Sequence, residues 1–408
     1  MVFFGCKKRF KQLCATLIAL LFMRLFYSKD IYSIRDFIGG AETQNSSLED
    51  YSPRPKNVLV FPKNSFHGRL FSGNARKKCR LNFDCDFSQI KQQVKTLSKY
   101  DLIVIGENEG VDRMVKKIHK HQYAKERRKD QIWAFIATEP STRLEKFDGF
   151  RDKELQNALN WTIFASHKAT INYPFFITKA ATPSSIQKSE LITSELKSRK
   201  KDVCWIFSDC IVDQSGRQGF VKEFLAHYEG NFHVWGKGLQ ECMKQRGIKE
   251  KVVDHGYLEG KREDVHAPQQ RIIQDCKFYF ALENSYCEGY ISEKVYNSVE
   301  GGAIPIMNGW RESCDKQLPK GSFIHVSDFE SISNLTKYIE RLVKNENEML
   351  AYHKWRQTAR LEQSEIETVC KICNKLKELD YRKAMGMKTE PEIIENPYET
   401  IINLQTCI

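Results

Sequence analysis

The 408-residue sequence lacks the short motifs that mark several common classes of enzyme. It contains no G-x-x-x-x-G-K loop, which P-loop hydrolases use to hold phosphate groups, and no G-x-S-x-G turn, which carries the nucleophilic serine of many esterases. It also contains no H-E-x-x-H sequence and no paired C-x-x-C motifs. These absences argue against an ATPase, an esterase and a dedicated metal site.

Glycine and proline are scarce, at 22 and 11 residues. Apolar residues make up 41% of the chain and charged residues 28%, which excludes collagen-like, low-complexity and wholly disordered proteins. At roughly 150 residues per domain, the length predicts two packed domains with some chain outside them.

Excess positive charge is confined to two short blocks. The formal net charge is +12, and residues 1–35 and residues 116–129 each contribute +6 of it, with seven Lys or Arg against one acid in each block. The rest of the chain therefore sums to zero. A protein that binds nucleic acid needs a basic face interleaved with side chains that read the bases, and neither block has that form. We therefore expect no nucleic-acid partner.

The N-terminus predicts a membrane anchor. Apolar residues dominate positions 13–27, and four basic residues lie just before them, between positions 7 and 11. Positive charge on that side places residues 1–12 in the cytoplasm and the chain beyond the anchor in the secretory lumen. A cleaved signal peptide has the same order of charges and stays the alternative, although no small-residue cleavage pattern follows the run. Residues 28–56 have the composition of a flexible stem.

Sequons and cysteines agree with a lumenal chain. Three N-glycosylation sequons follow the anchor, at Asn45, Asn160 and Asn334. Of the 13 cysteines, 11 lie beyond the anchor, so at least one should be free or intermolecular. In an oxidising lumen we expect disulfides that tie the two ends of the folded part together. The candidates, whose pairing the sequence leaves open, are Cys79, Cys85, Cys370 and Cys373.

Short apolar runs predict an α/β fold. Runs rich in β-branched residues predict buried parallel strands at 58–61, 102–105, 132–138, 203–207 and 232–235. The charged segment 112–129 and a helix face around 220–225 supply crossover helices. Two such series predict two Rossmann-like domains facing a cleft, over residues 57–190 and 200–365. Polar residues 182–201 are expected to be a linker, and the C-terminal segment 366–408 is poorly determined.

The most informative segment is residues 277–309. A strand at 278–282 is followed by a polar turn, and Ser292 is placed to cap a helix that Gly301-Gly302 ends before a strand at 304–307. A helix N-terminus above a parallel sheet offers free N–H groups to a diphosphate. An ordinary crossover with a solvated Glu-Lys pair explains the spacing equally well.

Three parts of this segment resemble the donor-binding signature of the α1,3-fucosyltransferase family. The family's F-E-N-S, Y-x-[ST]-E-K and G-[AT]-[IV]-P-[IV] elements correspond to residues 282–285, 290–294 and 302–306. The similarity extends over most of residues 57–373 and includes Cys370-x-x-Cys373.

The resemblance implies an enzyme with two Rossmann-like domains of the GT-B type. Such an enzyme transfers L-fucose from GDP-β-L-fucose, with inversion and in α1,3 linkage, to a GlcNAc residue of an N-glycan or another glycoprotein or glycolipid glycan. The resemblance also implies a single-pass type II protein of the Golgi membrane with its catalytic part in the lumen. We expect no tightly bound cofactor and leave stimulation by Mn²⁺ or Mg²⁺ open, because phosphate groups recruit such ions.

The same resemblance implies roles for six residues. Glu139 would remove the acceptor proton, since the following proline ends the strand and leaves the carboxylate beyond it. Arg217 and Lys294 would hold the diphosphate, and Glu293 would bond sugar or ribose hydroxyls. Asn284 and Tyr290 would shape the same pocket. A solvated loop acid at Glu139 and a turn-forming asparagine at Asn284 are the alternatives.

One stretch departs from the family pattern. After Asn160-Trp161-Thr162 the family usually has a Tyr-Arg-Arg-Asp-Ser-Asp run, where this chain has Ala165–Thr170. We therefore expect a changed acceptor preference. The rival hypothesis is a catalytically weak glycan- or nucleotide-binding relative.

Overall fold

The computed structural model describes residues 48–61, 71–89, 97–107, 109–121, 127–144, 148–207, 215–236, 252–256, 262–387, 389 and 392–407. The expected cytoplasmic tail and anchor, and most of the stem, lie outside these residues. Among the helices that are described, none has the length and apolar character needed to cross a membrane. Residues Ser52–Ile408 form one compact unit, and its described residues contain two large sheets and one two-stranded sheet.

The first sheet has the order β2-β3-β1-β4-β5-β6-β7, with every pair parallel except β2 with β3. Its strands are β1 (Lys56–Phe61), β2 (Gly73–Asn74), β3 (Cys85–Gln89), β4 (Leu102–Gly106), β5 (Ile132–Ile136), β6 (Trp161–Phe164) and β7 (Ile171–Asn172). The three strands predicted in this region are confirmed as β1, β4 and β5. All five residues of β4 and of β5 are buried, because parallel strands are covered on both faces.

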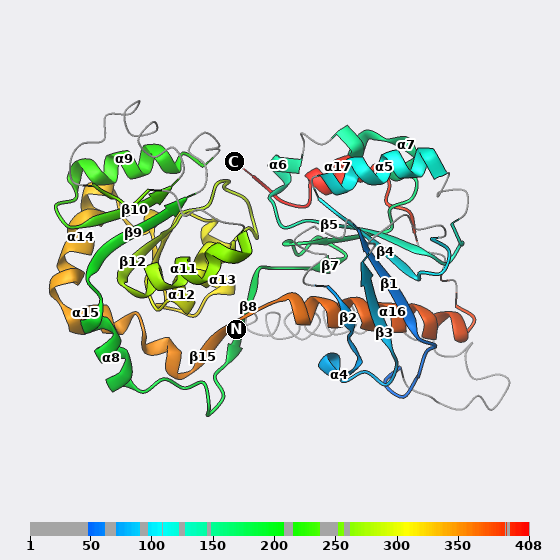
Figure 1. Cartoon of the computed structure of the whole chain (residues 1–408), viewed down its shortest axis with the longest axis horizontal. Coiled ribbons are helices and arrows are strands. Elements are labelled where there is room, and N and C mark those ends of the chain that lie inside the picture. The colour runs from blue at the N-terminus through cyan, green and yellow to red at the C-terminus, as the bar shows by residue number, and fades with distance from the viewer. Residues whose placement is uncertain are drawn as a thin grey trace, which may run out of the picture. The chain divides into compact units, whose positions relative to one another are not determined.

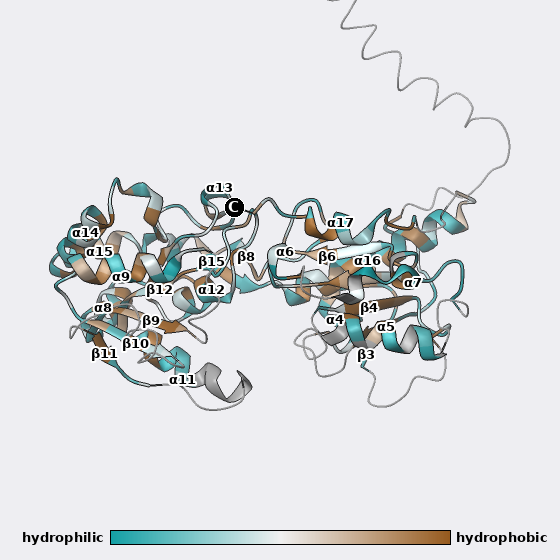
Figure 2. Cartoon of the chain, turned by 90° about the horizontal axis from the view of Figure 1, so that it is seen from above, coloured by the Kyte–Doolittle hydropathy of each residue, from teal (hydrophilic) through white to brown (hydrophobic). Residues whose placement is uncertain are grey.

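Helices cover the first sheet, and we call this assembly the first lobe (Figure 1). They are α4 (Arg76–Cys79), α5 (Glu109–His121), α6 (Ser141–Leu144), α7 (Lys153–Gln156), α16 (Glu365–Ala384) and α17 (Pro397–Ile402), with a 3-10 turn at Asp148–Arg151. The helix expected at 112–129 is confirmed only in part, since α5 spans Glu109–His121 and residues 129–130 form a turn. Figure 2 shows mostly hydrophobic strands in this sheet and hydrophilic residues along α5.

The second sheet is wholly parallel and has the order β11-β10-β9-β12-β13-β14. Its strands are β9 (Lys201–Phe207), β10 (Phe232–Gly236), β11 (Val252–Asp254), β12 (Cys276–Ala281), β13 (Ile304–Met307) and β14 (Ile324–His325). Numbered from β9, this is the 3-2-1-4-5-6 order of a Rossmann fold. The predicted strands at 203–207, 232–235, 278–282 and 304–307 are confirmed as β9, β10, β12 and β13.

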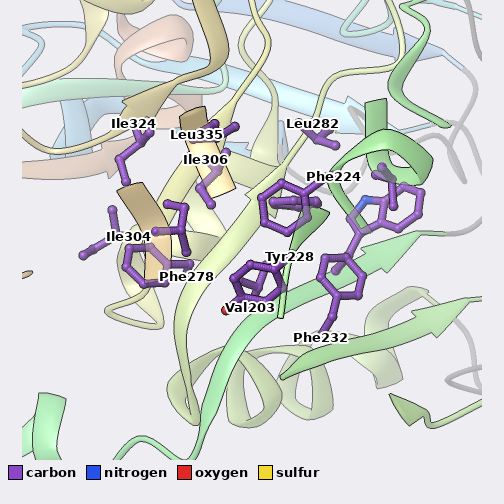
Figure 3. Close-up of a cluster of buried hydrophobic side chains, with 14 of the residues drawn as sticks. Val203, Phe224, Tyr228, Phe232, Phe278, Leu282, Ile304, Ile306, Ile324 and Leu335 are labelled. Atoms are coloured by element: carbon purple, nitrogen blue, oxygen red, sulfur yellow. The ribbon is translucent and has the colours of Figure 1, made fainter. Parts of the chain in front are cut away.

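The second sheet and its helices form the second lobe. The helices are α8 (Ser189–Ser198), α9 (Arg217–His227), α11 (Arg262–Gln274), α12 (Glu293–Glu300), α13 (Arg311–Gln317), α14 (Ile332–Lys344) and α15 (Glu346–Ala351), with 3-10 turns at Val326–Asp328 and Lys354–Gln357. Aromatic rings of α9 lie against the sheet, and the ring centroids of Phe224 and Phe280 are 4.9 Å apart. Figure 3 shows this core, with Phe224, Phe232 and Phe278 converging from a helix and two strands.

The expected linker at 182–201 contains a packed helix. Ile192 and Leu196 of α8 are 2% and 3% exposed and belong to the core of the second lobe. The polar composition hid this helix because only one narrow face of it is buried. Just before it, β8 (Phe176–Ala180) pairs antiparallel with β15 (Ala359–Gln363).

The C-terminal segment returns to the first lobe. Ile372 and Leu376 of α16 join the core beneath the first sheet. Disulfides link Cys79 to Cys370 and Cys85 to Cys373, which confirms the expected ties between the chain ends. Cys204–Cys276 and Cys287–Cys407 are also bonded, and Cys314 is the free cysteine within the described residues. The described residues of α16 and α17 thus complete the first lobe.

The structure argues against a glycan on Asn160. This residue is 7% exposed, and its Oδ1 accepts hydrogen bonds from the Trp133 N–H at 3.0 Å and from the Arg127 guanidinium. Its Nδ2 donates to the Glu392 carbonyl at 3.1 Å. An amide used in this way has no room for a sugar. Asn334 is exposed on α14, whereas Asn45 lies outside the described residues.

Candidate active site

The second sheet has a topological switch point between β9 and β12. These strands are neighbours, with Val203 opposite Phe278, yet the chain leaves them toward opposite edges of the sheet. In open parallel sheets, ligands bind beyond the carboxyl ends of the strands at such a point. Two of the expected site segments lie there: the start of α9, which follows β9, and the loop of residues 282–292, which follows β12.

A buried carboxylate organises the 282–292 loop. Glu283 is fully buried, and its two carboxylate oxygens accept hydrogen bonds from the Ser292 N–H and the Ser292 hydroxyl, each at 2.7 Å. Ser292 in turn caps α12, as expected. Glu283 is not among the residues for which the sequence predicts a role, although an acid at the end of an apolar strand is a signal that it must be paired. Its contacts fix where α12 begins.

Lys294 completes this arrangement in the first turn of α12. Its ammonium lies 3.2 Å from a Glu283 oxygen, 2.8 Å from the Ser292 hydroxyl and 3.8 Å from Glu293. Burial lowers the pKa of Lys294, but the carboxylates of Glu283 and Glu293 outweigh burial and raise that pKa above its ordinary value. Lys294 is therefore a fixed cation that stays charged at neutral pH. This positive charge lies at a helix N-terminus, where anions are already favoured.

Arg217 is the first residue of α9 and lies on the same side of the sheet. The preceding Gly216 has a φ of +68°, a left-handed conformation that glycine adopts without cost. The Arg217 side chain is 6% exposed and donates to the Leu282 carbonyl at 3.5 Å. Its charge also acts on Lys294 and lowers the pKa of that lysine. The two expected phosphate ligands are thus electrostatic neighbours.

Asn284 and Tyr290 lie in the same loop and are almost wholly buried. Asn284 is 8% exposed, and its Oδ1 accepts no hydrogen bond from the described residues. A buried polar atom of this kind is costly unless a ligand or water satisfies it. Tyr290 is 3% exposed and packs edge to face against Phe175, with ring centroids 6.2 Å apart.

Glu139 lies three residues beyond β5 in the first lobe. The backbone N–H groups of Thr138 and Glu139 donate to Glu107 at 3.2 and 3.0 Å, and the Thr138 hydroxyl donates to Glu107 at 2.8 Å. Glu107 follows β4, the neighbour of β5, and is 8% exposed. This second carboxylate was missed in the sequence. The signal was available, because acids after neighbouring parallel strands meet at one edge of the sheet.

The environment of Glu139 favours proton uptake. Burial raises the pKa of Glu139, and the charge of Glu107 raises it further, against smaller opposing effects of Arg143 and Lys294. Arg143 lies 3.6 Å from the Glu139 carboxylate, and Glu139 Oε2 accepts no hydrogen bond from the part of the chain that is described. Such a carboxylate is unsaturated in its hydrogen bonding and available to accept a proton.

The structure brings the expected residues from the two lobes into one electrostatic group. The pKa of Glu139 responds to Lys294 and Glu293, and the pKa of Tyr290 is raised well above its ordinary value by burial and then by Glu283 and Glu139. Within the described residues, no group of three or more His, Cys, Asp or Glu side chains lies close enough to hold a metal ion. The expectation of no tightly bound cofactor, with stimulation by Mn²⁺ or Mg²⁺ left open, stays a prediction.

Comparison with known proteins finds a family model that matches part of the chain. Residues 196–390 match the family model described as glycosyltransferase family 10 (fucosyltransferase), C-terminal. A 4-galactosyl-N-acetylglucosaminide 3-alpha-L-fucosyltransferase 9 from Rattus norvegicus, and its counterpart from Homo sapiens, are each 27% identical over 260 residues, which is 63% of this chain and 62% of theirs. The chain is thus matched over less than two thirds of the length of these relatives.

Other matches are shorter or more distant. The 4-galactosyl-N-acetylglucosaminide 3-alpha-L-fucosyltransferase FUT6 of Homo sapiens is 41% identical over 114 residues, which is 27% of this chain and 32% of that protein. A crystal structure of an alpha1,3-fucosyltransferase with GDP covers 83% of this chain and 94% of its own at 12% identity and a TM-score of 0.47. Arg217, Glu293 and Lys294 all lie inside the matched family domain. Over residues 196–390, the chain is thus similar to the fucosyltransferases of glycosyltransferase family 10.

Proposed function

We propose that this protein is an inverting α1,3-fucosyltransferase that uses GDP-β-L-fucose as its donor. Its acceptor would be a GlcNAc residue of an N-glycan or another glycoprotein or glycolipid glycan. The observation that carries the proposal is the pairing of fixed cations with a carboxylate of raised pKa. Lys294 and Arg217 lie at the switch point of the second sheet, and the charge of Lys294 acts on Glu139.

The two cations suit the leaving group. In an inverting single displacement, the acceptor hydroxyl oxygen bonds to C1 of fucose while the bond from C1 to the diphosphate oxygen breaks. Negative charge then grows on GDP. Cations held in place before the reaction stabilise that charge without reorganising. Glu283 and Ser292 hold the Lys294 ammonium in a defined position, so it meets this requirement.

Glu139 suits the acceptor side. The acceptor hydroxyl must lose its proton as the new bond forms, and Glu139 would take it. A carboxylate is a more effective base near neutral pH when its pKa is raised toward that pH. Burial and the Glu107 charge both raise the pKa of Glu139. Asn284, with its unsatisfied buried oxygen, would contact the donor beside Lys294.

A second candidate function is binding without efficient transfer. It is favoured by residues 165–170, where the side chains of the family's usual run are absent and Ala165 and Ser166 are buried. We rank it below transfer because Glu139, Arg217, Glu293 and Lys294 are all present. A chain that only bound the nucleotide would have no use for a base of raised pKa on the other lobe.

The distinguishing experiment is an assay of the purified full chain with labelled GDP-fucose and a panel of N-glycan and Lewis-type acceptors. Transfer to at least one GlcNAc-containing acceptor supports the proposal. Binding of GDP-fucose without transfer to any member of the panel would favour the binding protein instead. Repeating the assay with EDTA, Mn²⁺ and Mg²⁺ tests whether a divalent cation stimulates the reaction.

We also propose that the protein is a type II membrane protein of the Golgi, anchored by residues 13–27. Its support is the order of charges around the apolar run and the four disulfides of the described chain, which form in oxidising compartments. Protease treatment of intact microsomes should leave all but the short N-terminal tail protected. Digestion of most of the chain would contradict this topology.

A further inference from the structure

The last four described residues, 404–407, contact both lobes at the candidate active site. This C-terminal strap, as we call residues Leu404–Cys407, follows α17 and is disulfide-bonded through Cys407 to Cys287 in the 282–292 loop. The donor-binding role proposed for the 282–292 loop does not by itself explain why the loop is bonded to the end of the chain.

On the first lobe, the strap holds the turn that follows Glu139. Gln405 is 5% exposed, and its Oε1 accepts a hydrogen bond from the Ser141 N–H at 3.1 Å. Its Nε2 donates to the Ala165 carbonyl at 3.1 Å. The Ser141 hydroxyl also lies 3.4 Å from Cys407 Sγ. Ser141 is two residues from Glu139. The buried Gln405 side chain therefore connects the turn that carries Glu139 with Ala165.

On the second lobe, the strap is joined to the 282–292 loop by covalent and backbone bonds. Cys287 and Cys407 form an isolated antiparallel bridge in addition to their disulfide. The Glu288 N–H donates to the Thr406 carbonyl at 2.8 Å. Two positions further on, Tyr290 leads into Ser292 and Lys294, which we assign to the donor side. The strap therefore contacts the loop that positions α12.

Residues 165–166, at the start of the stretch that departs from the family pattern, contact both the strap and the 282–292 loop. The Ser166 hydroxyl donates to the Leu404 carbonyl, and Ala165 is 3% exposed. Gly289 of the loop has a φ of +80°, and a Cβ atom there would lie 2.6 Å from the Ala165 carbonyl oxygen. The absence of a side chain at Gly289 thus allows the loop to approach the first lobe closely. Ala165 and Ser166 are themselves buried, so a much larger side chain at either position would have to displace its neighbours.

We infer that the C-terminal strap is a positioning element of the active site, which holds the Glu139 turn and the 282–292 loop in register with each other. The inference deepens the proposed function and rests on it. Residues 165–166 would then form the surface of the first lobe against which the strap packs. Gln405 acts on the acceptor side through Ser141, and Cys407 acts on the donor side through Cys287.

Two variants of the full chain separate these effects. Cys287→Ala/Cys407→Ala removes the covalent tie between the strap and the 282–292 loop. The loop should then adopt its GDP-binding conformation only part of the time, and the apparent affinity falls in proportion to that population. We expect GDP affinity, measured by calorimetry, to weaken about threefold or more. Gln405→Ala keeps the disulfide but loosens the Glu139 turn. It should lower kcat about tenfold, because small misplacements of reacting groups are costly, while GDP affinity changes less than about twofold.

A matched control distinguishes positioning from simple loss of stability. Cys79→Ala/Cys370→Ala removes a disulfide of the first lobe that lies away from the site. This variant should leave GDP affinity and kcat unchanged. Hydrogen exchange gives a readout independent of transfer: amides of residues 287–292 should exchange faster in Cys287→Ala/Cys407→Ala than in the wild type.

The outcomes also separate this inference from the proposed function. A wild-type chain that neither binds GDP nor transfers fucose contradicts the proposed function. If the amides of residues 287–292 exchange at the same rate in Cys287→Ala/Cys407→Ala as in the wild type, the positioning role of the strap is contradicted, whether or not the chain transfers fucose. If the wild type transfers and the strap variants only melt at lower temperature, with kcat and GDP affinity unchanged in the folded protein, the strap is a structural tie and the inference is wrong.

Discussion

The Glu107 carboxylate accepts hydrogen bonds from the backbone N–H groups of Thr138 and Glu139, so one acid holds the turn that carries another. The arrangement has two effects on Glu139. It fixes the direction in which the turn leaves β5, and its negative charge raises the pKa of Glu139, second only to burial. Both the position of Glu139 and its pKa therefore depend on Glu107.

Replacing Glu107 by Gln should lower the pKa of Glu139, because the repulsion between the two carboxylates disappears. The acidic limb of the pH profile of kcat/KM should then move to lower pH. Glu154→Gln, on the exposed surface of α7, is the control and should leave the limb in place. An unmoved limb in Glu107→Gln would show that Glu107 has no electrostatic role.

Replacing Glu139 by Gln should stabilise the fold at neutral pH. A carboxyl group whose pKa rises on folding binds its proton more tightly in the folded chain, so its ionised form costs stability above that pKa. The variant should therefore melt at a higher temperature than the wild type at pH 7.5. The gain should shrink as the pH falls through the raised pKa and vanish below the ordinary carboxyl value. Thermal unfolding at several pH values measures it, and a gain independent of pH would contradict the assigned environment.

Replacing Lys294 by Ala should weaken GDP binding at least tenfold, since a charge-assisted hydrogen bond contributes about 1.5 to 3 kcal/mol. Calorimetry with GDP measures the effect, after circular dichroism has shown that the variant is folded. Lys277→Ala is matched to it, because Lys277 pairs with Asp202 at 2.8 Å in the same lobe but outside the site. Equal GDP affinity in Lys294→Ala and the wild type would remove Lys294 from the donor site.

The three sequons should differ in their use. Chain expressed in a secretory host should carry a glycan on Asn334, which is exposed, and none on Asn160, which is buried and hydrogen-bonded through both atoms of its amide. Mass spectrometry of glycopeptides tests this directly. Asn334→Gln should lose one glycan in mass and Asn160→Gln should lose none. A glycan on Asn160 would mean that the chain around Trp133 is packed differently.

Local patterns predicted the second lobe well. The apolar run before the 282–292 loop became β12, and Ser292 caps α12 as its position before Glu293 and Lys294 indicated. These features depend on neighbouring residues, which a sequence displays in order. The strand order of the sheet and the switch point between β9 and β12 follow from the way the crossovers stack, and periodicity alone does not specify them.

Contacts between distant residues could not be predicted in the same way. The bond between Glu107 and the Glu139 turn spans 32 residues, and the bond between Gln405 and Ser141 spans 264. The residues of the strap carry no motif of their own. Helix α8 was missed for a related reason, because Ile192 and Leu196 are buried by packing against the second lobe and not by a broad apolar face.

The most direct test compares fucose transfer and GDP affinity in the wild-type chain and in Glu139→Gln, with GDP-fucose and a GlcNAc-containing acceptor. The account predicts α-linked fucose on the acceptor from the wild type, a loss of roughly 10² to 10⁴ in rate in the variant, and nearly equal GDP affinity in both. Transfer by Glu139→Gln at the wild-type rate, or a wild type that binds GDP but transfers nothing, would contradict it.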